Sequence, residues 1–545
     1  MAIDLPPVMP PQLATQQQIQ QAERTEGAVI ERRINGILLR VLDAPYLSAE
    51  QLQALLAQAD SPSAAITALG RRYYSMGQLL VSLQYYRVAD TVTVIVNQGR
   101  VKGLRGNPRV THFFGGLVGD ADLQLDEFDR ARVPADIYAR RAAVDYQISY
   151  EHHPDQAVIL DFIEQPAAEP DASDLGVELN NQGSRFLGRY FAQLDGAQRF
   201  ATGTELRGAY RTVVSDWGGA QDGDDYHQFS LGIDQPMRYG MYGIEASHIQ
   251  YNRRFEVEEE VPDGDFCLPP LFPCNAIIQT EVLPLKAEVT EVALQGEQLL
   301  YSNPLRRLNL FERLSYVDSE IAPQQGGQAL LEERYAALEI GARYTLRDTV
   351  LGWPAVARLE LATKAGLSGD KGSFGTEPSA EVAIGRRTAE FLITKPAAAF
   401  NLSVGPRSEL RLSLQGQWAD GAQLPQQQQW VLGGGQTLSA WLPGTLIGDD
   451  GLLGSLTLQR RYDWGRWQLL SAAFVEYGSA RFRDTRDELG DWQSLADIGL
   501  GVTLETDFGL QSQLLVATSI HEDVQDEARL DRQQADFFWT LRWQL

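Results

Sequence analysis

The chain has 545 residues, 44% of them hydrophobic and 22% charged, and its 72 acidic against 47 basic side chains give a formal net charge of -25. So acidic a chain is a poor partner for nucleic-acid phosphates, which are bound by clustered Lys and Arg. No stretch approaches the ~18 uninterrupted apolar residues that a membrane-spanning helix needs. The composition is still compatible with a membrane β-barrel, because alternating strands hide an apolar face and keep the mean hydropathy low.

The first thirty residues are predicted to form an extended, Pro-rich lead and a polar helix. Thr15 and Gln18 have the spacing of a capping box, which starts a helix. Within the helix only Ile19 and Ala22 are apolar, so it has no stripe with which to join a core. We expect it to lie in water or in a polar channel, or to be disordered. The start lacks a signal peptide's basic and apolar regions, so an exported protein would be numbered from after a removed signal.

Residues 31–166 mix helix and strand patterns. Two small α+β units are expected, at 31–105 and 106–166, and a linker follows at 167–174. The segments with strand patterns are 34–42, 91–101 and 157–163, and those with amphipathic helix patterns are 48–58, 63–74 and about 126–145.

From residue 175 to 545 the pattern changes to alternating segments of about ten residues separated by Gly-, Asp- and Pro-rich turns. The last segment places Phe537, Trp539, Leu541, Trp543 and Leu545 on one face, and Thr540, Arg542 and Gln544 on the other. A soluble sandwich or propeller could also alternate. Charges on the polar face and aromatic residues near segment ends favour a membrane barrel instead, with a wet lumen and aromatic girdles. At roughly 23 residues per strand and connection, about sixteen antiparallel strands are predicted.

Few residues suggest chemistry. Cys267 and Cys274 lie in a Pro-rich segment and predict a small disulfide loop in an oxidising compartment, with a pair of free thiols as the alternative. The six His residues lack metal-site spacing, so neither a metal nor a cofactor is expected. There is no nucleophile elbow, P-loop, HExxH or Rossmann fingerprint, so we expect no enzyme. Asp449 and Asp450 could mimic a carboxylate pair, but their Gly-rich surroundings favour turn residues.

The whole chain resembles the outer-membrane transporters of two-partner secretion, the haemolysin secretion and activation type, in the superfamily that includes the assembly factor BamA. RRYYSMGQLLVSLQYYRVADTVTVIVNQGRV is similar to a first POTRA domain, although Gln78 stands where the family usually has an aromatic residue. LGVELNNQGSRFLGRY, from Leu175, is similar to a first barrel hairpin.

The most specific resemblance is to the family's long sixth extracellular loop, in QQQWVLGGGQTLSAWLPGTLIGDDG. The facing barrel-wall motif is FVEYGSA, with Phe474, Glu476 and Gly478. The loop residues concerned are Leu432, Gly433, Gly434, Ser439, Ala440, Trp441, Gly444, Gly448, Asp449 and Gly451. The family's loop-tip Arg-Gly-Tyr is replaced here by Ser439-Ala440-Trp441. The resemblance implies a loop folded into the barrel, whose Arg pairs with the facing acid. Here either Glu476 has another cation, or Trp441 packing holds the loop, or the loop is not locked.

The resemblance implies a monomeric barrel in the outer-membrane lipid of a bacterium, with POTRA domains in the periplasm. These domains would capture an unfolded, secreted partner polypeptide for export without ATP, and the N-terminal helix would plug the resting pore. The alternatives are an outer-membrane protein assembly factor of the BamA kind and, less favoured, a passive porin.

Overall fold

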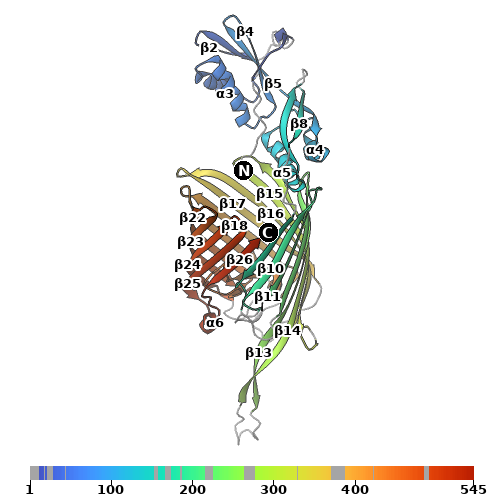
Figure 1. Ribbon diagram of the computed structural model, residues 1–545, viewed down its shortest axis with the longest axis vertical. Coiled ribbons are helices and arrows are strands. Elements are labelled where there is room, and N and C mark those ends of the chain that lie inside the picture. The colour runs from blue at the N-terminus through green and yellow to red at the C-terminus, as the bar shows by residue number, and fades with distance from the viewer. Residues whose placement is uncertain are drawn as a thin grey trace.

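The protein consists of two small α+β units stacked on one mouth of a large β-barrel, as the computed structural model shows (Figure 1). The structure describes residues 11–16, 19–20, 29–42, 44–152, 157–165, 173–184, 187–214, 225–262, 276–327, 329–369, 387–421, 423–483 and 490–545. Cys267, Cys274, Gln18 and Ala22 lie outside these ranges, so the disulfide and part of the predicted helix stay predictions. No described helix is long and apolar enough to cross a membrane.

The first unit is a five-stranded sheet with two helices on one face. Its strand order is β1-β4-β5-β3-β2, with β1 parallel to β4. Leu39, Leu69, Tyr73 and Val94 are fully buried in the core between the helices and the sheet. The elements are β1 (Gln12–Leu13), β2 (Val29–Ile34), β3 (Ile37–Leu42), α2 (Ala49–Ala57), α3 (Pro62–Ser75), β4 (Val81–Val88) and β5 (Thr91–Gln98).

The second unit has a three-stranded sheet in the order β6-β8-β7, covered by two helices. In its core the Phe114 ring packs against the tilted rings of Phe128 and Phe162, at centroid distances of 5.5 and 4.5 Å. The elements are β6 (Arg100–Gly106), α4 (Pro108–Phe114), the 3-10 turn η1 (Gly115–Leu117), α5 (Leu125–Ala142), β7 (Asp145–His152) and β8 (Ala157–Gln165).

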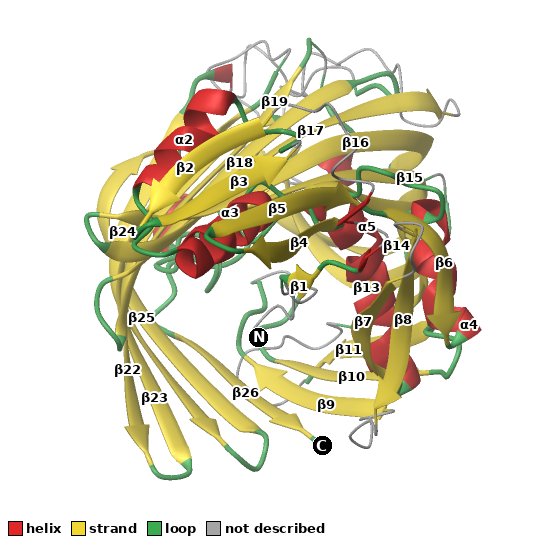
Figure 2. Ribbon diagram, turned by 90° about the horizontal axis from the view of Figure 1, so that it is seen from above, coloured by secondary structure: helices red, strands yellow, loops and turns green. Residues whose placement is uncertain are grey.

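The structure differs from the sequence predictions at two places in these units. The strand expected at 34–42 begins only at Ile37, because Asn35 and Gly36 take positive φ (49° and 81°) and form the tight turn that joins β2 to its neighbour β3 (Figure 2). The strand expected at 91–101 ends at Gln98, and β6 continues in the other sheet. The two sheets therefore divide at Gly99, whereas the predicted boundary at 105–106 falls inside β6.

Within the described residues, sixteen antiparallel strands close into a barrel, which confirms the predicted fold and strand number. The first strand pairs with the last, from Asn180 with Thr540 to Gly176 with Gln544. The strands are β9 (Ser173–Asn180), β10 (Phe191–Arg199), β11 (Glu205–Val213), β12 (Tyr226–Met237), β13 (Gly240–Pro262), β14 (Ala276–Ser302), β15 (Arg306–Pro323), β16 (Leu331–Val350), β17 (Trp353–Gly369), β18 (Leu392–Ser403), β19 (Ser408–Ala419), β22 (Asp450–Trp464), β23 (Trp467–Arg481), β24 (Gln493–Thr506), β25 (Leu510–Asp523) and β26 (Phe538–Gln544).

The two faces of the barrel wall differ as the alternation predicts. Leu541 and Trp543 of β26 are exposed on the outside, while Arg542 between them forms ion pairs with Glu178 and Asp195 in the lumen. An exposed apolar exterior around a charged bore is what a lipid-spanning barrel requires. The β13–β14 hairpin is longer than its neighbours and extends beyond the mouth opposite the α+β units (Figure 1).

Candidate functional site

A long loop between β19 and β22, here called the lumen loop (residues 420–449), crosses the inside of the barrel. It contains η2 (Gln426–Gln428) and a short hairpin of β20 (Trp430–Leu432) with β21 (Leu446–Gly448). On one wall, the Gln428 amide donates to the Tyr335 hydroxyl of β16 at 2.8 Å. The tip contacts β23 and β24 on another wall. Because one loop binds both walls, it occupies the lumen.

The loop tip is held by two carboxylates of the wall. The backbone N–H and the hydroxyl of Ser439 both donate to Oε2 of Glu476, at 2.8 and 2.9 Å. The backbone N–H of Ala440 donates to Oδ2 of Asp497 at 2.8 Å. None of these donors carries a charge, so the loop is docked without the Arg that the family resemblance implies at 439.

Trp441 adds an apolar anchor to this polar dock. Its side chain is fully buried among residues from the loop and from β22 and β24, including Leu432, Leu438, Leu453 and Leu495. The segment that joins β25 to β26, which contains α6 (Glu527–Asp531), covers this cluster with Leu530. It also pairs with the tip: Leu442 N–H donates to Gln533 O and Ala535 N–H to Ala440 O, both at 2.8 Å.

Glycines make these close approaches feasible. Gly433 has φ +109°, and a Cβ there would collide with the carbonyl oxygen of Leu442. On the facing wall a Cβ at Gly478 would lie 2.7 Å from Leu432 and 2.8 Å from Leu438. The remaining predicted residues lie along the same path: Gly434, Gly444, Gly448 and Gly451 in or beside the loop arms, and Phe474, with its ring against Gly499, on β23.

Asp449 and Asp450, predicted as turn residues, have fully buried side chains, and Asp450 is the first residue of β22. Asp449 accepts backbone N–H groups from Leu424 and Arg483, at 3.0 and 2.8 Å. Asp450 forms ion pairs with Arg481 (2.8 Å) and Arg483 (2.6 Å). The acidic pair therefore fastens the base of the lumen loop to β23, which is a structural use of carboxylates.

The described part of the predicted plug helix lies at the first α+β unit. β1 pairs with β4, and Ala14 N–H donates to Tyr85 O at 2.9 Å. Directly after this strand, the Ile19 N–H donates to the Thr15 carbonyl oxygen at 3.0 Å. Main-chain pairing thus holds residues 12–14 at the first sheet, directly before Thr15, and the plug assignment stays a prediction.

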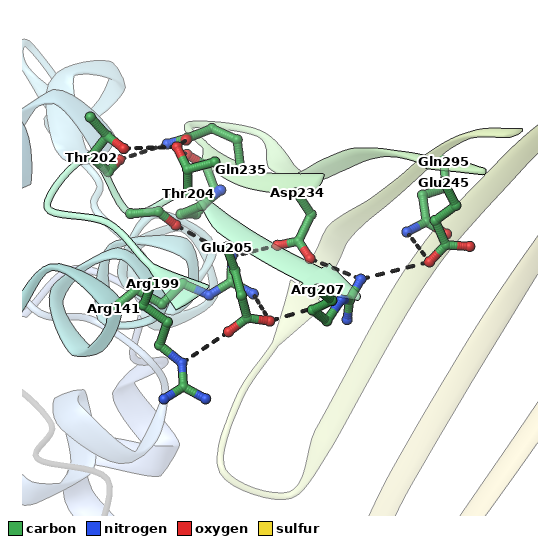
Figure 3. Close-up of polar contacts among 12 residues, drawn as sticks. Arg141, Arg199, Thr202, Thr204, Glu205, Arg207, Asp234, Gln235, Glu245 and Gln295 are labelled. Carbon is green, nitrogen blue, oxygen red and sulfur yellow. Dashed lines mark hydrogen bonds and ion pairs between the residues drawn. The ribbon is translucent and has the colours of Figure 1, made fainter. Parts of the chain in front are cut away.

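Arg141 of α5 holds the second α+β unit against the adjacent mouth of the barrel, and this contact is here called the clamp (Figure 3). Arg141 forms ion pairs with Glu205 of β11 at 3.3 Å and with Asp234 of β12. All three side chains are largely buried. The same carboxylates are shared with Arg199 and Arg207 of the wall, so the clamp is continuous with the charges of the lumen.

The charged side chains of the lumen form a series of ion pairs along the wall from β26 round to β17, here called the ladder. Each basic group forms ion pairs with acids on two other strands close by: Arg542 with Glu178 and Asp195, Arg207 with Asp234 and Glu245, Arg313 with Glu245 and Glu291, and Arg343 with Glu297 and Glu360. A cavity of about 450 Å³ opens beside the ladder. The sequence predicted a polar lumen but not this pairing, which depends on strand register.

Comparison with known proteins finds similarity in structure only. No family model matches the sequence, and no curated protein matches it. CdiB from Escherichia coli superimposes with a TM-score of 0.69 at 15% identity, over 96% of this chain and 92% of that chain. The chain has the fold of CdiB. CdiB from Acinetobacter baumannii gives a TM-score of 0.62 at 12% identity, over 97% of this chain and 96% of that one.

A third solved structure widens the comparison. BamA from Haemophilus ducreyi, lacking POTRA domains 1–3, gives a TM-score of 0.51 at 11% identity, over 94% of this chain and 100% of that one. The predicted architecture, two small α+β units followed by a closed antiparallel β-barrel, is thereby confirmed at the level of fold.

Three contributors to these contacts are not predicted from the sequence: Asp497, Arg141 and the 524–537 segment. Asp497 lies in an ordinary alternating strand pattern, and Arg141 is one of several Arg residues at the end of a helix. No local signal distinguishes them, because their partners are remote in the sequence.

Proposed function

We propose that the protein is an outer-membrane pore that exports an unfolded partner polypeptide to the cell surface without ATP. The observation that carries this proposal is the lumen loop docked inside a charged barrel, with two α+β units at one mouth. Such a barrel has a wet path and a removable obstruction. The closed barrel of a single chain also favours a monomer in the membrane, with the α+β units on the periplasmic side.

The second unit supplies an edge for capturing a client. In the described sheets, β4 of the first unit is covered by β1, whereas β7 of the second unit forms a sheet edge. An extended polypeptide can add to such an edge through main-chain hydrogen bonds, which tolerate many sequences. β7 belongs to the unit that Arg141 holds against the barrel mouth. A strand captured there is therefore close to the entrance.

The lumen favours passage rather than retention of the client. The basic groups of the ladder are engaged by carboxylates of the wall. A passing chain therefore meets a hydrated surface in which strong charge pairs are already made. The obstruction to remove is the lumen loop with its Trp441 cluster.

An assembly factor for outer-membrane proteins is the second candidate, because the chain also shares the fold of BamA. Export is favoured by the higher TM-scores with CdiB, 0.69 and 0.62 against 0.51. A passive porin is disfavoured, because the described lumen is crossed by a loop bound to both walls.

A photo-crosslinking amino acid at Gln147, an exposed position of β7, tests the proposal in cells. The matched control is Ile163, which pairs with Gln147 on the central strand β8 and is 45% exposed. We expect an adduct with a secreted polypeptide at Gln147 and little at Ile163. An adduct with barrel precursors would support the assembly alternative, and equal labelling at both positions would contradict capture at the β7 edge.

A further inference from the structure

Glu476 and Asp497 face each other across two neighbouring strands beneath the loop tip. They are register partners of β23 and β24, and their exposed fractions are 7% and 0%. Directly opposed side chains of an antiparallel pair have Cβ atoms about 4.5–5.5 Å apart. The two carboxyl groups are therefore neighbours in a nearly dry site.

The groups that bind this pair are uncharged. Ser439 gives Glu476 its backbone N–H and hydroxyl, and Ala440 gives Asp497 its backbone N–H. Oδ1 of Asp497 is buried and accepts no hydrogen bond from a nitrogen or hydroxyl donor of the described residues.

The neighbouring elements bring no cation to the pair in the described part of the chain. Ser455 of β22 and Ser519 of β25 stand opposite Glu476 and Asp497 in register. Arg481 and Arg483 are engaged by Asp450, and His521 bonds to Ser494 at 3.1 Å. The loop tip itself, Ser439 to Trp441, has no charged side chain.

We propose that Glu476 and Asp497 share one proton, and that this proton docks the lumen loop in place of a loop cation. Two adjacent carboxylates in a site of low dielectric cannot both ionise cheaply, so one proton stays between them. The shared proton gives Oδ1 of Asp497 the hydrogen bond that it otherwise lacks. It leaves one net negative charge for the three neutral donors of the tip to stabilise.

The consequence is a loop whose docking weakens as the pH rises. When the tip leaves, water reaches both acids, and hydrated carboxyl groups are ionised above a pH of about 4. Undocking then releases one proton, so the undocked population rises about tenfold per pH unit until the docked pair also loses its proton. Loop release as a step of transport rests on the proposed function, but the docking equilibrium does not.

Hydrogen exchange of the Ser439 and Ala440 amides measures this equilibrium in the full-length protein without any client. In the wild type, protection corrected for intrinsic exchange should fall about tenfold per pH unit above pH ~5. Asp497→Asn should abolish this slope, because the Asn amide can accept from Ala440 and donate permanently to Glu476. Glu476→Gln should behave alike. Glu409→Gln, which removes an acid paired with Arg411, is the matched control and should keep the wild-type slope.

Infrared spectroscopy gives a second readout. The wild type should show the carbonyl band of a buried protonated carboxyl group, and Asp497→Asn should lack it. A wild-type pH slope in Asp497→Asn, or the absence of that band in the wild type, would overturn the shared proton. Failure of crosslinking at Gln147 with an intact pH slope would instead count against the export proposal alone.

Discussion

Replacing Trp441 by Ala tests how much the apolar cluster contributes to holding the lumen loop. The side chain is fully buried in the docked state. Its indole N–H has no acceptor among the described residues, so truncation removes packing without breaking a hydrogen bond. Trp-to-Ala changes in cores cost about 3–5 kcal/mol. Because the undocked tip exposes residue 441 to water in either variant, nearly the whole cost falls on the docked state.

At about 1.4 kcal/mol per factor of ten, the undocked population should rise by roughly two to three and a half orders of magnitude. Hydrogen exchange of the amides from Ser439 to Leu442 is the assay, with heat-modified gel mobility to confirm that the barrel is closed. Trp464→Ala is the control, since Trp464 is 65% exposed at the β22–β23 turn. Equal protection at the loop tip in Trp441→Ala and Trp464→Ala would refute the reasoning.

Three further changes test the other contacts. Arg141→Ala should weaken the attachment of the second unit to the barrel by about 1–2 kcal/mol. This is less than the ~3–5 kcal/mol for a buried charge left without a partner, because Glu205 keeps Arg199 at 3.0 Å and Asp234 keeps Arg207 at 2.9 Å. The distribution of spin-label distances from α5 to the barrel should broaden, and an unchanged distribution would contradict this role of Arg141. Gly433→Ala should destabilise the docked loop by more than about 1 kcal/mol. Gly465→Ala, where a Cβ meets open space, should leave hydrogen exchange at the loop tip unchanged. Equal exchange rates at the tip in the two variants would disprove a steric requirement at Gly433. Burial raises the pKa of Asp129 in α5, although Arg132 lowers it. The stability of the second unit should therefore decline as the pH rises from about 4 through the raised pKa. Asp129→Asn should remove this decline, measured as hydrogen-exchange protection of the α5 amides, and a persisting decline would assign it to another group.

The sequence was sufficient for the architecture because period-two alternation acts locally. The strand of Trp539, Leu541 and Trp543 could be assigned one lipid-facing side from its own residues alone. The hairpin at Asn35-Gly36 also has a local signal, since Asn-Gly between apolar runs strongly favours a tight turn. What could not be predicted are contacts set by strand register. Asp497 stands beside Glu476 only because β23 and β24 pair in one particular alignment, and nothing in either strand's composition fixes that alignment.

Without an Arg at position 439, the loop tip is held by two kinds of contact: hydrogen bonds to Glu476 and Asp497, and the Trp441 packing that was one of the three alternatives drawn from the sequence. Three neutral hydrogen bonds to carboxylates contribute at most about 1.5–3 kcal/mol each, reduced by the cost of drying the two acids. The Trp441 cluster contributes a similar total through packing that does not depend on charge. The hydrogen bonds to Glu476 and Asp497 require the shared proton, whereas the packing of Trp441 does not. Each set of contacts can therefore be lost without the other. Raising the pH weakens the first and leaves the second, so Trp441→Ala combined with high pH should release the loop far more completely than either alone. If the double perturbation gave only the effect of Trp441→Ala, the carboxylates would be bystanders in the docking of the loop.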